Sequence, residues 1–295
     1  MIRVPFKQVD VFTDQPFRGN PVAVILAADA LSREQMQHIA RWTNLSETTF
    51  VLQPRTPEAS YRLRIFTPMS ELPFAGHPSV GTAHALLESG LLSSGSGELV
   101  QECEAGLLPV RVLGSKDQRT IALRSPAAQR RQVDDQGLLT AALADWPIGD
   151  LAPVLYDNGP HWWLVELRDE EAVRSLRPDL QAVAALCRTT GAVGLAVFAA
   201  ANAGQDYQRV VRAFCPADGI PEDPVTGSAN ASMGAYLRDV GQLKRGDRYV
   251  ASQGRELQRD GRVEVSIEAD GVWIGGQAVT VVDGTLSAGL GKQAR

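Results

Sequence analysis

The sequence contains few of the residues from which metal and redox sites are built. Its 295 residues include three cysteines and four histidines. The cysteines are odd in number, stand far apart and form no Cys-x-x-Cys pair, and the histidines are scattered along the chain. We therefore expect no metal site, and we expect reduced, mostly structural cysteines at Cys103, Cys187 and Cys215.

Basic charge and long apolar runs are also scarce. The formal net charge is -5, so the chain has no basic field that would attract the phosphates of a nucleic acid. One of the longer apolar runs, residues 22–28, is much shorter than the ~20 residues that cross a bilayer, and it lacks the cleavage pattern of a signal peptide. The sequence thus predicts a cytoplasmic protein with no nucleic-acid or membrane partner.

The remaining composition is that of an ordinary globular chain with two lobes. Hydrophobic residues make up 44% and charged residues 21%. The length is near the upper limit for one hydrophobic core. A polar stretch at 125–135, which contains Pro126, interrupts the pattern between the halves. We predict an N-terminal lobe at 1–126 and a C-terminal lobe at 127–295, with a last strand near 277–286 that can pack back on the N-terminal lobe.

Local patterns predict an α+β fold. Ser32 and Gln35 have the spacing of a capping box, which predicts a helix over 33–42. The expected strands outnumber the long helices, as in α+β proteins. Strands are predicted at 6–12, 22–26, 48–53, 61–66, 194–200, 262–267 and 279–282, and further helices at 78–88, 179–187 and 224–238.

Two motifs occur twice in the same order. The first pairs Arg64-x-Phe66-x-Pro68 with Arg212-x-Phe214-x-Pro216. After a similar gap, the second pairs His77-Pro78-x-x-Gly81-Thr82-Ala83 with Asp223-Pro224-x-x-Gly227-Ser228-Ala229. Either match alone fits chance, but together they predict a duplicated strand-turn-helix unit.

The second motif has the character of a helix start. A hydrogen-bond acceptor followed by proline suits the N-cap and first position of a helix, so we expect His77 and Asp223 to be N-caps. The turns that follow are rich in Gly, Ser and Thr, and their backbone N–H groups can hold a carboxylate or phosphate. A purely capping role is the alternative, and the duplication favours an anion site.

Glu47 stands at the entrance to an apolar strand. If the carboxyl group is buried, its pKa rises toward the range of a general acid or base at neutral pH. If it faces water instead, it is an ordinary surface glutamate, and sequence position alone leaves both readings open. Likewise, Trp162 and Trp163 beside His161 can either line a pocket or pack in a core.

Several runs resemble the phenazine-biosynthesis PhzF-like family of isomerases. They span nearly the whole chain in the family's order: Val9-Asp10-Val11-Phe12-Thr13, Phe17-Arg18-Gly19-Asn20-Pro21-Val22-Ala23-Val24, Asn44-Leu45-Ser46-Glu47-Thr48, Glu71-Leu72-Pro73-Phe74-Ala75-Gly76-His77-Pro78 and Glu222-Asp223-Pro224-Val225-Thr226-Gly227-Ser228. The resemblance implies a duplicated diaminopimelate-epimerase-like fold, with two pseudo-symmetric lobes that each wrap a mixed sheet around a long helix and an active site between the lobes.

The resemblance also implies roles for individual residues. Catalytic roles fall on Glu47, His77 and Asp223, with Glu47 as the single acid/base, and substrate-binding roles fall on Asn20, Ser46, Gly76, Thr226, Gly227 and Ser228. It further implies a small carboxylate substrate, no metal, no organic cofactor and a homodimer.

Two alternatives stay open at the level of the sequence. The chain can be a non-catalytic protein of the same fold that binds a small anion. It can also be an epimerase or lyase with a drifted substrate, although the related two-thiol mechanism does not fit, because the helix starts carry Gly76-His77 and Glu222-Asp223 where thiols would stand.

Overall fold

The computed structural model describes residues 2–93, 95, 97–115, 118–133 and 137–288. The chain packs into two compact units, which are Met1–Leu123 with Gly276–Arg295 (unit 1) and Arg124–Gly275 (unit 2). The lobes expected from the sequence were 1–126 and 127–295, with a last strand near 277–286 that can pack back on the N-terminal lobe, and the segment after Gly275 does lie in unit 1. Among the described residues, no helix is long and apolar enough to cross a membrane.

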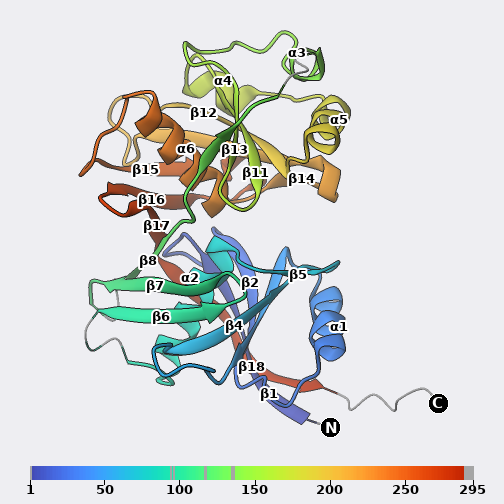
Figure 1. Cartoon of the computed structure of the whole chain (residues 1–295), viewed down its shortest axis with the longest axis vertical. Helices are drawn as coiled ribbons and strands as arrows, with labels where there is room; N and C mark the ends of the chain where they lie inside the picture. Colours follow the sequence, from blue (N-terminus) through green and yellow to red (C-terminus); the bar gives the residue numbers. More distant parts are fainter. Residues whose placement is uncertain (1, 94, 96, 116–117, 134–136, 289–295) are drawn as a thin grey trace, which may run out of the picture. The chain divides into compact units, whose positions relative to one another are not determined.

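Unit 1 is a mixed sheet with two long helices (Figure 1). Strand β1 is antiparallel to β2, β2 is parallel to β3, β3 is antiparallel to β4, and β4 is antiparallel to β5 but parallel to β6. Strands β6, β7 and β8 then form an antiparallel meander. The elements are β1 (Ile2–Val11), β2 (Asn20–Ile25), α1 (Arg33–Thr43), β3 (Glu47–Leu52), β4 (Tyr61–Phe66), β5 (Glu71–Leu72), α2 (Gly76–Glu88), β6 (Glu98–Cys103), β7 (Gly106–Leu113), β8 (Thr120–Arg124) and β18 (Ala278–Ala288).

Unit 2 repeats this order of pairings. Strand β10 is antiparallel to β11, β11 is parallel to β12, β12 is antiparallel to β13, and β13 is antiparallel to β14 but parallel to β15. An antiparallel meander of β15, β16 and β17 follows. The elements are β9 (Gln129–Arg131), α3 (Gly137–Ala142), β10 (Val154–Asp157), β11 (His161–Glu166), α4 (Glu170–Ser175), α5 (Leu180–Thr190), β12 (Gly194–Ala200), β13 (Arg209–Cys215), η1 (Pro216–Asp218), β14 (Ile220–Asp223), α6 (Gly227–Asp239), β15 (Arg248–Gln253), η2 (Arg255–Leu257), β16 (Gly261–Glu268) and β17 (Gly271–Gly276).

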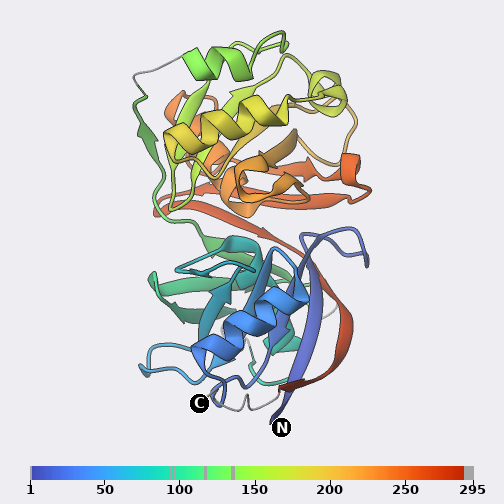
Figure 2. The ribbon, with the colours of Figure 1, turned by 90° about the vertical axis from the view of Figure 1, so that its right-hand side faces the viewer.

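The matching order of pairings confirms the predicted duplicated α+β fold. Helices α1 and α5 occupy equivalent places between parallel strands, and Figure 2 shows each of them lying in front of the strands of its own unit. Helices α2 and α6 are the second equivalent pair, and both are almost entirely buried. In each unit, one helix therefore covers the sheet and a second is enclosed by the core.

In each unit, a further strand is added beside the first strand of the pattern. Strand β18 is antiparallel to β1 along its whole length, from Ile2 opposite Ala288 to Val11 opposite Ala278, and Figure 1 shows the two running together. Its counterpart is β9, which is antiparallel to β10, the first strand of the unit 2 pattern. The predicted strand at 279–282 thus lies in the first half of a longer strand.

Helix α1 forms for the reasons that its sequence suggests. Ser32 and Gln35 make the predicted capping box, and Asn44 ends the helix in the left-handed conformation. Its buried residues Met36 and Ala40 are one turn apart and pack with Phe50 and other apolar residues of the sheet.

The repeated Arg-x-Phe motif has the same physical role in both units. Arg64 of β4 makes a two-pronged ion pair with Glu71 of β5 at 2.6 and 2.8 Å, and Arg212 of β13 does the same with Glu222 of β14 at 2.9 and 2.8 Å. Each guanidinium also lies over the phenylalanine two residues on, at 5.2 and 5.0 Å from the ring centre. The motif therefore fastens each short strand β5 or β14 to its neighbour.

Helix α2 approaches the sheet most closely at Gly81. A Cβ atom at this position would fall 2.5 Å from Cγ1 of Val22 and 2.9 Å from Cγ2 of Val11. These distances are below any normal carbon contact, so only glycine lets the helix lie this near β1 and β2.

We predict that Gly81→Ala destabilises the protein by about 1–3 kcal/mol, because overpacking outweighs the better helix propensity of alanine. Urea unfolding measures the change. Gly284→Ala is the matched control, since nothing lies within 4 Å of a Cβ built on Gly284. Equal stability of the two variants would contradict the close approach.

Candidate active site

Glu47 of β3 and His77 of α2 lie at the end of the unit 1 sheet where β2 and β3 begin. Glu47 is the first residue of β3 and lies level with Val22 of the parallel strand β2, so both side chains point to the same face. That face meets α2, because Val22 lies against Gly81. His77 is one helical turn before Gly81 and shares its side of the helix. As a result, Glu47 Oε2 and His77 Nε2 are 3.3 Å apart.

The Glu47 carboxyl group is in a setting that favours its neutral form. The side chains of Glu47 and His77 are only 16% and 8% exposed. Burial raises the pKa of Glu47 from its ordinary value of 4.5 to about 7, and a hydrogen bond from the Ser46 side chain opposes this rise. Glu47 is thus poised to exist in both protonation states near neutral pH.

Two more of the predicted residues lie at this end of unit 1. Asn20 is the first residue of β2 and is buried. Gly76 is the first residue of α2, and the N-cap of that helix, Ala75, supplies no side-chain cap. The N–H groups of the first turn therefore have no capping side chain from the N-cap residue, which leaves them suited to an external acceptor.

The predicted N-cap roles of His77 and Asp223 are wrong. Helix α2 begins at Gly76, so His77 lies inside its first turn, and Pro78 causes no loss there because first-turn N–H groups have no partner within the helix. Asp223 instead ends β14, where it pairs with Ala213. Helix α6 starts only at Gly227, with Thr226 as its N-cap.

Asp223 is held by the turn that leads into α6. The hydroxyl group of Thr226 donates to Asp223 Oδ2 at 2.5 Å. Gln253 at the end of β15 binds the same turn, accepting from the Thr226 N–H at 3.0 Å and donating to the Asp223 carbonyl at 3.1 Å. Sequence reasoning did not find Gln253, which lies 30 residues from Asp223.

Ser228, in the first turn of α6, is fixed by two side chains from other elements. Trp162 of β11 donates from Nε1 to Ser228 Oγ at 3.0 Å, and Asn158 donates to the Ser228 carbonyl at 3.0 Å. Of the adjacent aromatic pair, Trp163 packs in the core. His161 lies 3.2 Å from Asp157. Of these aromatic residues, Trp162 therefore contacts the first turn of α6 through Ser228.

The structure brings Ser46, Glu47 and His77 together in unit 1, and Asp223, Thr226, Gly227 and Ser228 together in unit 2. Within the described part of the chain, no group of three or more His, Cys, Asp or Glu side chains is arranged to hold a metal ion. Cys187 and Cys215 are buried and Cys103 is half-buried, and the structure joins none of these three in a disulfide.

Solved structures share this architecture. A PhzF-family protein of Bacillus anthracis matches with a TM-score of 0.85 and 28% identity, over 97% of this chain and all of that one. A hydroxyproline epimerase of Agrobacterium vitis, 15% identical, matches with a TM-score of 0.68 over 96% of this chain and 92% of that one, which shows a common fold alone. The chain thus has the fold of the diaminopimelate-epimerase-like isomerases, as predicted.

The family model described as phenazine biosynthesis-like protein, PhzC-PhzF, matches residues 9–284. Among curated relatives, antisense-enhancing sequence 1 of Schizosaccharomyces pombe is 38% identical, over 95% of this chain and 97% of its own length. The trans-2,3-dihydro-3-hydroxyanthranilate isomerase of Pseudomonas aeruginosa is 37% identical, over 89% and 90%. The chain belongs to the PhzF-like family and is an enzyme of the isomerase class.

We predict that the environment of Glu47 makes stability depend on pH. Because the folded-state pKa is raised from 4.5 to about 7, the stabilising effect of the protonated carboxyl is complete below pH 4.5 and is lost as the pH rises through about 7. Relative to Glu47→Gln, the wild type should therefore lose about 3 kcal/mol between pH 4.5 and pH 8, from the 1.4 kcal/mol that corresponds to each pH unit.

Urea unfolding of both proteins across this range measures the difference. Glu58→Gln serves as the control because Glu58 is an exposed glutamate outside the site. If the stability of Glu47→Gln stays parallel to that of the wild type at all pH values, Glu47 is not buried as described.

Proposed function

We propose that the protein is a cofactor-independent isomerase that moves a proton between two carbon atoms of a small carboxylated substrate, with Glu47 as the acid/base. The observation that carries the proposal is the Glu47 carboxyl group, buried beside His77 Nε2 at 3.3 Å, with its pKa raised to about 7. A base of this strength can both remove and return a proton near neutral pH.

The reaction needs one group in two successive states. The ionised Glu47 carboxylate takes a proton from a carbon next to a double bond of the substrate, and the electron pair of that C–H bond shifts along the unsaturated system. The carboxylic acid so formed then delivers the same proton to a second carbon, which restores the carboxylate. We propose that His77, whose Nε2 lies 3.3 Å from Glu47 Oε2, orients this oxygen through the cycle.

The substrate carboxylate would be taken by the start of α6. The backbone N–H groups of Gly227 and Ser228 lie in its first turn, at the positive end of the helix dipole. Ser228 Oγ accepts from Trp162, so its own proton is available to donate to a substrate oxygen. Asp223 and Thr226 supply an acceptor and an ordered turn beside these donors. We also propose substrate-binding roles for Asn20, Ser46 and Gly76 of unit 1.

The name of one relative supports the proposed substrate class. The Pseudomonas aeruginosa relative is named for trans-2,3-dihydro-3-hydroxyanthranilate, which is an unsaturated cyclic carboxylate with a C–H bond that can be acidified by the adjacent double bonds. We propose a substrate of the same chemical class. A cytoplasmic location and a homodimer also stay predictions, and sedimentation of the purified chain would test the second.

We predict that Glu47→Gln lowers the rate of proton exchange between a substrate carbon and deuterated water by at least about 100-fold, because an amide cannot take up the proton. The assay follows trans-2,3-dihydro-3-hydroxyanthranilate and a panel of related cyclic carboxylates by NMR. Glu58→Gln should exchange at the wild-type rate.

Full exchange by Glu47→Gln would remove Glu47 from the mechanism. If the wild type itself binds these carboxylates tightly but exchanges no proton of any of them, the chain is a small-anion-binding protein of this fold instead. Exchange at a stereocentre with no shift of a double bond would identify an epimerase.

The pH profile gives a separate prediction. Because the ionised form of Glu47 starts the reaction and its pKa is about 7, kcat/KM should rise tenfold per pH unit below pH 7 and level off above it. Steady-state rates between pH 5 and pH 9 test this expectation. A profile that is flat from pH 5 to pH 8 would show that Glu47 is not the base.

A further inference from the structure

Gln253 is a buried amide whose hydrogen bonds all serve one turn. The side chain is fully buried at the end of β15. Its Oε1 accepts from the Thr226 N–H at 3.0 Å and from Asn230 Nδ2 at 3.2 Å, while its Nε2 donates to the Asp223 carbonyl at 3.1 Å and to Thr226 Oγ1 at 2.9 Å. Gln253 therefore spans the whole segment from Asp223 to Asn230.

The orientation of this amide is fixed by chemistry. The Thr226 N–H can only donate, so its partner on Gln253 must be the oxygen. Asn230 Nδ2 also donates to the Thr226 carbonyl at 2.8 Å, which identifies it as a nitrogen and gives the same answer. Gln253 must then present its NH2 group to the Asp223 carbonyl and to Thr226 Oγ1.

The direction of the next hydrogen bond follows. Thr226 Oγ1 accepts from Gln253, and a hydroxyl group has a single proton to donate. Its other close partner is Asp223 Oδ2 at 2.5 Å, so that proton points at the carboxylate. The relay runs in one direction, from Gln253 through Thr226 to Asp223, and it requires Asp223 Oδ2 to be an acceptor.

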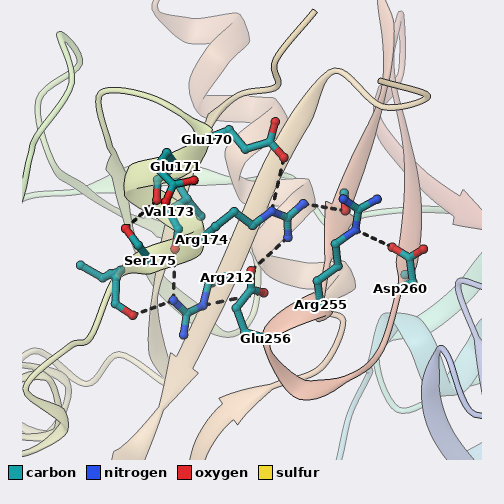
Figure 3. A network of polar contacts seen from close by, with 12 residues as sticks. Glu170, Glu171, Val173, Arg174, Ser175, Arg212, Arg255, Glu256 and Asp260 are labelled. Atoms are coloured by element: carbon teal, nitrogen blue, oxygen red, sulfur yellow. Dashed lines mark hydrogen bonds and ion pairs between the residues drawn. The ribbon is translucent and has the colours of Figure 1, made fainter. Parts of the chain in front are cut away.

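The segment that carries Gln253 is anchored by a network of ion pairs (Figure 3). Gly254 comes next with φ of 97°, and a Cβ on it would fall 2.5 Å from the Pro224 carbonyl oxygen, so the chain lies tight against the turn. Beyond it, Glu256 accepts from Arg174 at 3.2 Å, and Arg255 pairs with Asp260 at 2.9 Å.

Several charged residues on the elements around Asp223 take part in ion pairs with one another. Glu222, its neighbour on β14, is bound by Arg212 of β13. Glu256 and Arg255 of η2 are bound by Arg174 of α4 and by Asp260. These ion pairs lie beside the Asp223 carboxylate, and the hydroxyl group of Thr226 donates to that carboxylate directly.

We propose that Thr226 and Gln253 are positioning residues that commit Asp223 to its ionised, proton-accepting state. The relay aims one donor at Oδ2 and so favours a carboxylate that can accept from a donor group of the substrate. The use of that acceptor rests on the proposed function, in which Asp223 contacts the substrate. The relay itself exists without substrate.

The test compares Thr226→Val, which keeps the shape but removes the proton, with Thr226→Ser, which keeps the hydroxyl. Protein labelled with 13C at the aspartate carboxyl carbon is titrated by NMR, and the Asp223 signal is identified by its loss in Asp223→Asn. In Thr226→Val the midpoint of this titration should rise by about one pH unit or more, because a hydrogen bond to an ionised carboxylate is lost. In Thr226→Ser it should stay near the wild-type value.

An Asp223 midpoint in a folded Thr226→Val that equals the wild-type midpoint overturns the proposal. Gln253→Met replaces the amide by an apolar side chain of similar size and should raise the midpoint by less than Thr226→Val, because the hydroxyl is then present but no longer directed. No change in Gln253→Met would remove Gln253 from the relay. If Gln253→Met does not fold, the Thr226 pair decides alone.

The titration needs no substrate, so it separates this proposal from the proposed function. If the wild type isomerises none of the substrates, the proposed function is wrong. The NMR titration then still decides whether the relay acts on Asp223. The Asp223 midpoint is also the readout that a purely structural role of Thr226 would not move, because the acid limb of the rate is assigned to Glu47.

Discussion

The close approach of α2 to β1 and β2 at Gly81 is the constraint on which the unit 1 site depends. It sets the helix so near the strands that His77, one turn earlier, reaches the start of β3. There it meets Glu47 at 3.3 Å. Burial between helix and sheet is also what raises the pKa of Glu47 to about 7. Packing and acid/base character therefore have a single origin, and a helix displaced from the sheet would lose both.

The duplicated architecture puts different chemistry at equivalent places. Both units fasten a short strand with an Arg–Glu pair and then start a buried helix. In unit 1 the helix begins early and includes His77 in its first turn, whereas in unit 2 the chain stays extended through Asp223 and the helix begins at Gly227. One fold unit thus supplies a helical histidine in one copy and a strand-end aspartate, fixed by Thr226 and Gln253, in the other.

Much of the fold was predictable from local patterns, and the capping box of α1 and the repeated motifs were read correctly. Among the meander strands, β16 was predicted at 262–267, whereas β7 and β17, which contain residues typical of turns, were missed. Strand β7 includes Pro109, which nevertheless pairs with Val100, and β17 includes three glycines. The helix starts were wrong by a few residues because the same X-Pro pair suits a first turn as well as a strand end.

The site was predictable only in part. Sequence position left Glu47 undecided between a surface and a buried carboxylate, and the resemblance to the PhzF-like family selected it. The contacts of Trp162 and Gln253 could not be predicted in this way, because each has a partner far away in sequence. Trp162 lies 66 residues from Ser228, and Gln253 lies 27 residues from Thr226. Contacts of this kind depend on how strands and helices pack, which local patterns do not encode.

The pairing of β1 with β18 has a consequence for how the chain is made. The first strand of unit 1 finds its full-length neighbour only in residues 278–288, whereas the strands of unit 2 all come from one continuous stretch. During synthesis, unit 2 can complete its sheet before unit 1 can, although unit 1 begins to emerge first. Until residues 278–288 are made, the edge of β1 that pairs with them is open to strands of other molecules. Conditions that slow the synthesis of residues 278–288 should therefore promote aggregation through β1.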